Sequence, residues 1–188
     1  MTKIKWLVMC FLTTALLISC EKDYTPRPHA YMRIELPEHQ YLPIDAPNCP
    51  FEFQIPLQSL LIAKDTSCWY NLEFPKFNAT LHISYAQLHN DFAKRSEDAR
   101  NLAMKHIVKA NDINEVFFQN DTARVYGMIY DFEGSTASTY QFFLTDSTHH
   151  FFRGSLYFNV IPNPDSLAPV AVFIKEDLRH LLSTFRWK

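Results

Sequence analysis

The sequence predicts an α+β fold, mainly an antiparallel sheet of six to seven strands with two principal helices. Several short segments alternate apolar and polar residues, which is the period of a half-buried strand. Two longer segments repeat their apolar residues every three or four positions, which is the spacing of one helix face. The later strand segments are joined by short polar links, and these indicate antiparallel neighbours because a parallel crossover needs a dozen or more residues.

The predicted strands lie on both sides of the first helical segment. Three come before it, the last two joined as a hairpin by a turn at Pro75–Asn78: Phe51–Ile55, Cys68–Phe74 and Ala79–Tyr85. Four come after it: Ile113–Gln119, Arg124–Phe132, Thr139–Thr145 and Phe151–Val160. Together they predict one sheet that buries at least one of its faces.

The first helix is predicted within Gln87–Ala110, a stretch that contains no proline or glycine. The second is predicted from about Ser166 or Ala168 to Phe185, with Asp165 or Ser166 as the cap and Pro169 in the first turn. One helix on each face of the sheet, or both on one face, would bury their apolar stripes. This element order resembles the Mog1 and photosystem-subunit-P (PsbP) sandwich.

The first twenty residues have the layout of a bacterial lipoprotein signal. Lys3 and Lys5 precede an apolar run at Trp6–Ile18, and Ser19 stands before Cys20. A membrane-spanning helix is the alternative, but a span needs about 20 apolar residues and this run is shorter. We expect residues 1–19 to be removed, Cys20 to be acylated and to anchor the chain to a membrane, 20–50 to be a tether and irregular wrap, and 51–188 to be one α+β domain.

Composition excludes several classes of function. Removal of Lys3 and Lys5 with the signal leaves 16 basic and 20 acidic residues, a net charge of −4, and there is no basic block. Nucleic acid is therefore not an expected partner. Phosphate-cradling loops need several glycines close together, and the three glycines at 127, 134 and 154 exclude a P-loop and a dinucleotide fingerprint. No cofactor is expected.

Two cysteines, Cys49 and Cys68, remain after Cys10 leaves with the signal and Cys20 takes the lipid. In an oxidising envelope compartment a disulfide between them is the favoured interpretation. Two buried free thiols are the alternative. A metal site is disfavoured because neither cysteine has a Cys or His at short ligand spacing.

The histidines, and the loop that follows the predicted strand Thr139–Thr145, are candidates for a metal site or a catalytic site. His82, His89 and His106 lie on different elements, and the side chains of adjacent His149 and His150 point opposite ways on a strand. We expect no metal ligands, and His106 to be a hydrogen-bonded core residue. The letters Asp146, Ser147 and His149 suggest a catalytic triad, but a polar turn explains them better. No catalytic residue is predicted, and nothing in the sequence indicates an enzyme.

Aromatic residues make up 15% of the chain and occur in adjacent pairs such as Phe142-Phe143 and Phe151-Phe152. Adjacent residues on a strand face opposite sides of the sheet. If both faces are covered by helices, these rings form core. If one face is only partly covered, the remainder is a partner surface.

Nearly the whole mature chain resembles the gliding motility lipoprotein GldD family of the Bacteroidetes. The most specific similarity lies in Phe151–Pro169. The similar stretches are Tyr31–Pro37, Asn48–Phe51, Cys68–Asn71, Phe74–Tyr85, Val125–Asp131, Gln141–Ser147, His150–Asn159 and Pro162–Pro169.

The resemblance implies a non-enzymatic envelope lipoprotein required for gliding, in a system intertwined with type IX secretion. By this resemblance, Cys20 corresponds to the acylated cysteine of the family, and Cys49 and Cys68 correspond by position to a cysteine pair. Two hypotheses follow. The chain is an interaction or assembly component that contacts other gliding or secretion envelope proteins, facing the periplasm from the inner or outer membrane. Alternatively, it is a lipid-anchored binder or hydrolase of an envelope glycan or small ligand, acting through Asp146–His150.

Overall fold

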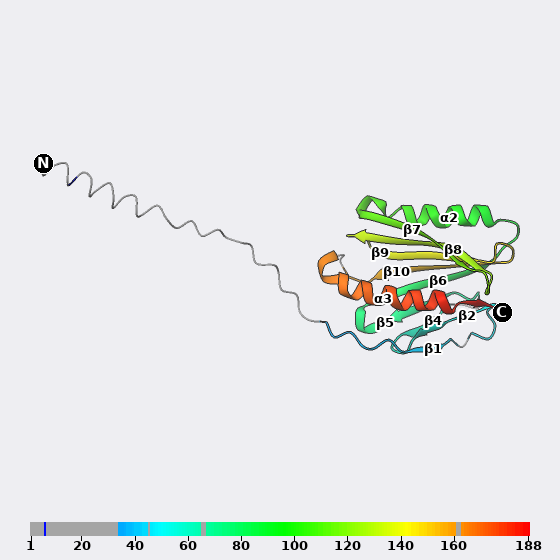
Figure 1. The fold of residues 1–188 in the computed structure, drawn as a ribbon. Coiled ribbons are helices and arrows are strands. Elements are labelled where there is room, and N and C mark those ends of the chain that lie inside the picture. Colours follow the sequence, from blue (N-terminus) through cyan, green and yellow to red (C-terminus); the bar gives the residue numbers. More distant parts are fainter. Residues whose placement is uncertain (1–5, 7–33, 45, 65–66, 161–162) are drawn as a thin grey trace. The chain divides into compact units, whose positions relative to one another are not determined.

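The computed structural model describes residues 6, 34–44, 46–64, 67–160 and 163–188 (Figure 1). The chain divides into two units, Met1–Met32 and Arg33–Lys188. The second unit contains the main sheet and the two principal helices. It begins well before Phe51, because part of the segment predicted as an irregular wrap is built into the domain.

Seven antiparallel strands form the main sheet, in the order β4-β5-β6-β10-β9-β8-β7. The prediction of an α+β fold with six to seven antiparallel strands is confirmed. Short edge strand β4 was missed because its four residues are mostly exposed and show no alternation. The strands are β4 (Leu60–Ala63), β5 (Tyr70–Phe74), β6 (Ala79–Gln87), β7 (Ala110–Asn120), β8 (Val125–Gly134), β9 (Ser138–Thr145) and β10 (His150–Phe158).

Two small sheets join the ends of the domain. β1 (Tyr41–Pro43) pairs with β3 (Gln54–Pro56), and β2 (Phe51–Glu52) pairs with β11 (Arg186–Trp187) at the C-terminus. The alternation at 51–55 correctly predicts which side chains are buried, but these residues belong to the small sheets and not to the main one. Tyr41–Pro43 is a strand where irregular chain was expected.

Helix α3 (Pro164–Thr184) packs its apolar stripe on one face of the main sheet. Its cap is Asn163, whose side chain accepts a hydrogen bond from the Ser166 amide, and not Asp165 or Ser166 as predicted. Pro169 lies in the second turn without ending the helix. The stripe is buried throughout: Val170, Phe173, Ile174, Leu178, Leu181 and Leu182.

Helix α2 (Phe92–Met104) is shorter than the predicted 87–110. Gln87 still pairs with His150 in the sheet, and Asn90 has a positive φ of 60°, so the helix starts only after it. After Met104 the chain forms a short 3-10 turn and enters β7 at Ala110. Because β7 is the far edge of the sheet, the chain must cross one face between β6 and β7, and α2 lies on that crossing (Figure 1).

The two faces of the sheet have separate cores. Phe142 and Phe152 belong to the larger core under α3, whereas Phe143 and Phe151 belong to the smaller core under α2. A Cβ atom added to Gly154 would stand about 2.4 Å from the ring of Phe142 on the neighbouring strand. This contact is too close, so the position requires glycine. The paired aromatics therefore face both sides, as predicted, with one helix on each.

Phe152→Ala tests the larger core. Its side chain is fully buried, and truncation should cost about 3–5 kcal/mol in the free energy of unfolding, measured by urea denaturation. The exposed ring of Phe117 provides a control, since Phe117→Ala should cost less than about 1 kcal/mol. A small effect at Phe152 would contradict the packing described here. Its ring contacts four other rings: Phe51, Phe53, Phe142 and Phe185.

Candidate functional site

The predicted lipid site cannot be placed. Cys20 and the signal at 1–19 lie outside the described residues, so acylation of Cys20 stays a prediction. Within the part of the chain that the structure describes, no helix has both the length and the apolar character of a membrane span.

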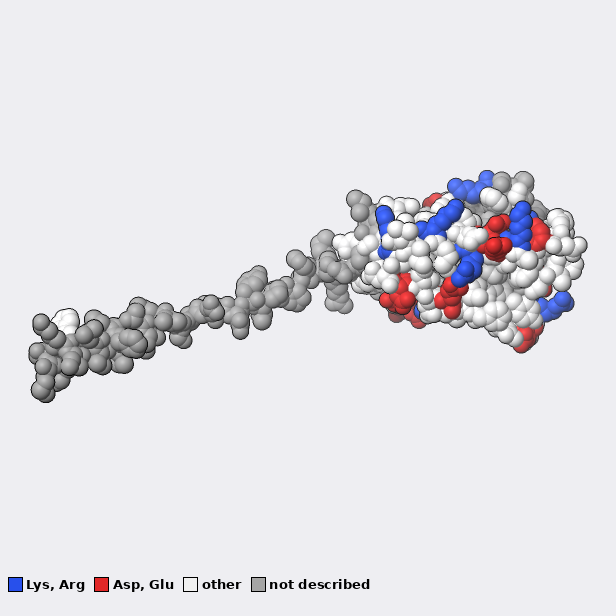
Figure 2. Space-filling model, turned by 90° about the horizontal axis from the view of Figure 1, so that it is seen from above, with Lys and Arg blue, Asp and Glu red and all other residues white. Residues whose placement is uncertain are grey.

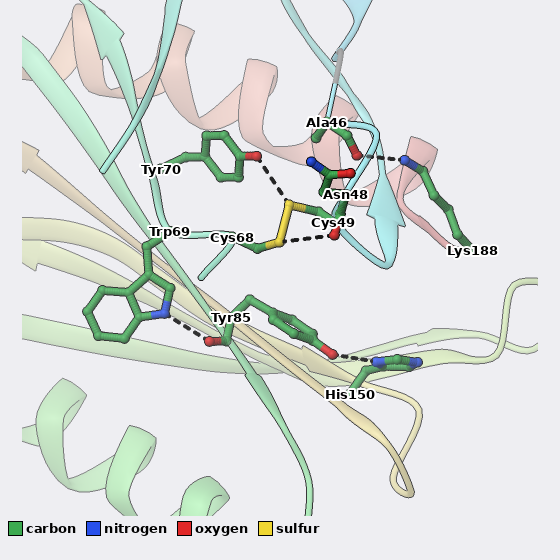
Figure 3. Close-up of a disulfide and its surroundings, with 9 residues drawn as sticks. All are labelled: Ala46, Asn48, Cys49, Cys68, Trp69, Tyr70, Tyr85, His150 and Lys188. Atoms are coloured by element: carbon green, nitrogen blue, oxygen red, sulfur yellow. Dashed lines mark hydrogen bonds between the residues drawn. A yellow bond between two sulfur atoms is a disulfide. The ribbon is translucent and has the colours of Figure 1, made fainter. Parts of the chain in front are cut away.

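Cys49 and Cys68 form a disulfide that connects the N-terminal segment to the start of β5 (Figure 3). Both cysteines are buried, and the Tyr70 hydroxyl donates a hydrogen bond to the Cys49 sulfur at 3.1 Å. Lys188 at the C-terminus donates to the carbonyl of Ala46 at 2.8 Å. The disulfide and this hydrogen bond hold residues 46–49 against two distant parts of the domain.

The loop between β9 and β10 is a turn closed by Asp146. Its carboxylate accepts hydrogen bonds from the amides of Thr148, His149 and His150 at 2.8–3.0 Å, and from the Thr148 hydroxyl. Burial would raise the pKa of Asp146, but these hydrogen bonds outweigh it and hold the pKa well below its ordinary value. The Asp146 carboxylate is therefore occupied by hydrogen bonds within its own turn.

The predicted alternative, a triad, is not assembled. No hydrogen bond in this fully described loop connects the Ser147 hydroxyl to His149 or His150. His149 is 70% exposed, while His150 turns the other way, with Nδ1 2.8 Å from the Tyr85 hydroxyl and its ring stacked on Trp187. The two adjacent histidines therefore diverge, as predicted, and the geometry favours a turn.

The remaining histidines make separate polar contacts. His82 Nδ1 lies 2.9 Å from the Asn71 side-chain oxygen, and His106 Nε2 lies 3.4 Å from the Tyr157 hydroxyl. His106 is hydrogen-bonded, as expected, but it lies beyond the end of α2 and is only half-buried, so the prediction that it is a core residue is wrong. Among the described residues, no three His, Cys, Asp or Glu side chains are grouped to hold a metal ion.

A buried acid that sequence reasoning missed joins the N-terminal segment to α3. Asp177 Oδ1 lies 2.6 Å from His39 Nδ1 and accepts a 3.0 Å hydrogen bond from the Tyr41 hydroxyl, and the Asp177 side chain is fully buried. Burial raises the pKa of Asp177 despite these two hydrogen bonds. His39 and Tyr41 each lie more than 130 residues from Asp177 in the chain. In the sequence, the only sign of this contact is an acid that interrupts the apolar stripe of α3.

An apolar groove of about 660 Å³ lies beside α2, on the side of β7 and β8; we call it the α2 groove. Phe117 of β7 forms one wall and is 61% exposed. An ion pair between Arg100 of α2 and Glu115 of β7, at 3.2 Å, connects the helix to the edge strand at the surface. The apolar lining residues are Phe92, Phe117, Tyr126, Met128, Tyr130 and Phe143.

The α2 groove borders an open edge of the sheet. β7 pairs only with β8, so the outer edge of its 11 residues has no strand partner in the described domain. Natural edge strands are usually short or protected by lysine or proline, and β7 has neither protection. On the face seen in Figure 2, charges of both signs are interspersed between wide uncharged areas. The partner surface anticipated from the aromatics would lie here, on the partly covered face.

A family profile described as "Gliding motility lipoprotein GldD" matches residues 21–187. The chain belongs to the GldD family. The resemblance seen in the sequence motifs is confirmed, and membership of this lipoprotein family makes the chain a membrane-anchored protein of the cell envelope. The family description names a motility process and no reaction.

No curated protein sequence matches this GldD-family chain. Among solved structures, the solution structure of cyanobacterial PsbP (CyanoP) from Synechocystis sp. PCC 6803 is similar, with a TM-score of 0.46 and 10% sequence identity. The similarity covers 84% of this chain and 98% of that chain.

Removal of the disulfide in this GldD-family domain should lower stability substantially. The two cysteines are 19 positions apart, and a cross-link of that span is worth about 3 kcal/mol in the chain-entropy model, or roughly 6–12 °C in Tm. Cys49→Ala/Cys68→Ala should show this drop in a thermal melt. Reductant should lower the Tm of the wild-type protein but not of the double variant; equal sensitivity would contradict a bonded pair.

Stability of the domain should fall in mild acid. Burial lowers the pKa of His82, His106 and His150, so the folded state resists their protonation. A histidine whose pKa is lower in the folded state than the unfolded value of about 6.5 contributes stability to the fold at a pH above that value. As the pH falls, this stability is lost, by at most about 1.4 kcal/mol per pH unit for each proton taken up. Urea denaturation between pH 7.5 and 5 should show the decline, and His106→Asn should reduce its slope. Constant stability over that range would contradict this.

Proposed function

We propose that this GldD-family chain is a non-catalytic interaction or assembly component of the gliding and type IX secretion machinery. Acylated Cys20 would hold it at a membrane, facing the periplasm. The observation that carries the proposal is the α2 groove next to the open edge of β7. The occupant we propose is an extended apolar segment of another envelope protein of this machinery.

An extended segment suits this surface because two kinds of contact are available together. The outer edge of β7 offers backbone groups that a further antiparallel or parallel strand would satisfy. On the α2 side, alternate side chains of such a strand would stand beside Phe117 at the opening of the α2 groove. Backbone pairing would supply affinity, and the apolar groove would select which side chains fit.

The exposed ring of Phe117 gives the docking a driving force. Complete burial of a phenylalanine side chain is worth about 1.5–3 kcal/mol, and more than half of this ring is in water. The Arg100–Glu115 ion pair connects α2 to β7 without a partner bound. A preformed site of this kind requires less ordering on binding.

The alternative of a hydrolase depends on Asp146–His150. The Asp146 carboxylate is occupied by backbone amides, and the Ser147 hydroxyl has no histidine partner in that loop. This geometry favours the docking proposal over a hydrolase.

The proposal is tested by crosslinking intact cells that produce the full chain and purifying it with its partners. Phe117→Asp should lower recovery of gliding or secretion proteins at least tenfold, because it places a charge in the apolar contact. Leu57→Asp is the matched control, since Leu57 is 57% exposed and does not line the groove. Cys20→Ala should also lose the partners if membrane attachment positions the domain.

Gliding provides an independent measurement in a strain that lacks the chromosomal gene. Wild-type protein and Leu57→Asp should restore spreading, and Phe117→Asp should not, at equal protein levels and with equal Tm values. Full recovery of partners and of spreading by Phe117→Asp would contradict docking through the α2 groove.

A further inference from the structure

A second cavity, of about 160 Å³, lies on the opposite side of α2 from the α2 groove; we call it the Arg153 pocket. It is open to solvent and is bordered by α2, by strands β6 and β10, and by Trp69, which lies just before β5. Its size is close to the roughly 150 Å³ of an engineered protein cavity that accommodates benzene. Residues that line it include Trp69, Ser84, Arg95, Asp98, Phe151 and Arg153.

Arg153 occupies the middle of β10, and its side chain is half-buried. Its guanidinium donates one hydrogen bond, from Nη2 to the neutral side-chain oxygen of Gln141 at 2.7 Å. No carboxylate lies within ion-pair distance of it anywhere in the described part of the chain. A guanidinium has five N–H donors, so this one has donors left for a ligand.

A half-buried cation without an acidic partner loses part of its hydration, and no carboxylate compensates for that loss. Burial lowers the pKa of Arg153, although the nearby phenol of Tyr157 acts in the opposite sense. The other lining arginine, Arg95, is already paired with Asp91 at 2.7 Å. Arg153 is therefore the positive charge in this pocket that still needs an anion.

Trp69 provides an apolar wall in a fixed orientation. Its indole N–H donates a 2.9 Å hydrogen bond to the Tyr85 carbonyl, and the side chain is 47% exposed. It directly follows the disulfide residue Cys68, and Figure 3 shows the indole extending away from the disulfide. The ring is thus held in place while one side stays available for contact.

We propose that the Arg153 pocket binds a ligand carrying a single carboxylate next to a ring-sized body. The guanidinium of Arg153 would take the carboxylate, in the bidentate geometry that these two groups favour, and Trp69 would contact the body. A monoanion fits better than a phosphate monoester, because Asp98 also lines the pocket and would repel a second negative charge. This binding is distinct from the proposed protein docking, since it uses other residues on the other side of α2.

The probe for the test is N-acetyl-L-phenylalanine, titrated by calorimetry into the full chain in detergent. Its uncharged amide and phenyl phosphate are the comparison ligands. The acid should bind saturably at one site, and the amide and the phosphate should each bind at least tenfold more weakly.

Variants separate the roles of the lining residues. Arg153→Met should lower the affinity for the acid at least tenfold while leaving the Tm equal or higher, because it removes a half-buried charge that has no acidic partner. Asp98→Asn should raise the affinity several-fold. Trp69→Ala, at a partly exposed position, should lower it at least threefold and serves if Arg153→Met fails to fold. Arg124→Met, at an exposed arginine outside the pocket, is the control and should have no effect.

Three results would overturn the proposal: no saturable binding of the acid, equal binding of the acid and its amide, or tighter binding of phenyl phosphate. Unchanged affinity in both Arg153→Met and Trp69→Ala would do the same. None of these results bears on partner recovery through Phe117, so the two proposals fail separately.

Discussion

Strand β9 is buried along its entire length, on both faces of the sheet, and the rest of the architecture follows from that. Alternate residues face α3 and α2, so a slip of one position would move Phe142 and Phe143 to the wrong cores. A strand that is buried on both sides needs cover on both sides. One helix on each face is the arrangement that buries it, and the long crossing from β6 to β7 and the return after β10 provide those helices.

The two helices cover the sheet unequally, and the features that suggest function lie on the side of α2, the shorter helix. α3 has 21 residues and is supported by the small sheets of the N-terminal segment, so it covers more of its face and buries the larger core. α2 has 13 residues and contributes only Ala99 and Ala103 to the buried core. On its two sides it leaves an apolar groove and a pocket with an unpaired guanidinium. A short helix over a wide sheet thus leaves room for ligands and partners without weakening the main core.

The segment that leads from the predicted anchor into the domain is fixed by contacts between residues far apart in the chain. His39 and Tyr41 meet Asp177 on α3, and Cys49 is bonded to Cys68. Each contact adds a polar or covalent link near a strand of two or three residues, because the apolar packing of so short a strand would not hold it in place by itself. For a lipoprotein of the GldD family, this integrates the membrane-proximal chain with the folded core.

The fold class, the presence of two helices, the turn at 75–78 and the opposite orientation of the adjacent rings in Phe142-Phe143 and Phe151-Phe152 could all be predicted from the sequence. These features depend on local periodicity and turn chemistry, which neighbouring residues encode. Its motifs also identified the family. The pairing of β1 with β3 and of β11 with β2, the shortened ends of α2, the buried Asp177 contacts, the α2 groove and the lack of an acidic partner for Arg153 became apparent only in the folded chain. Each of these depends on which distant residues meet, or fail to meet, when the chain packs, and no periodicity within a segment carries that information.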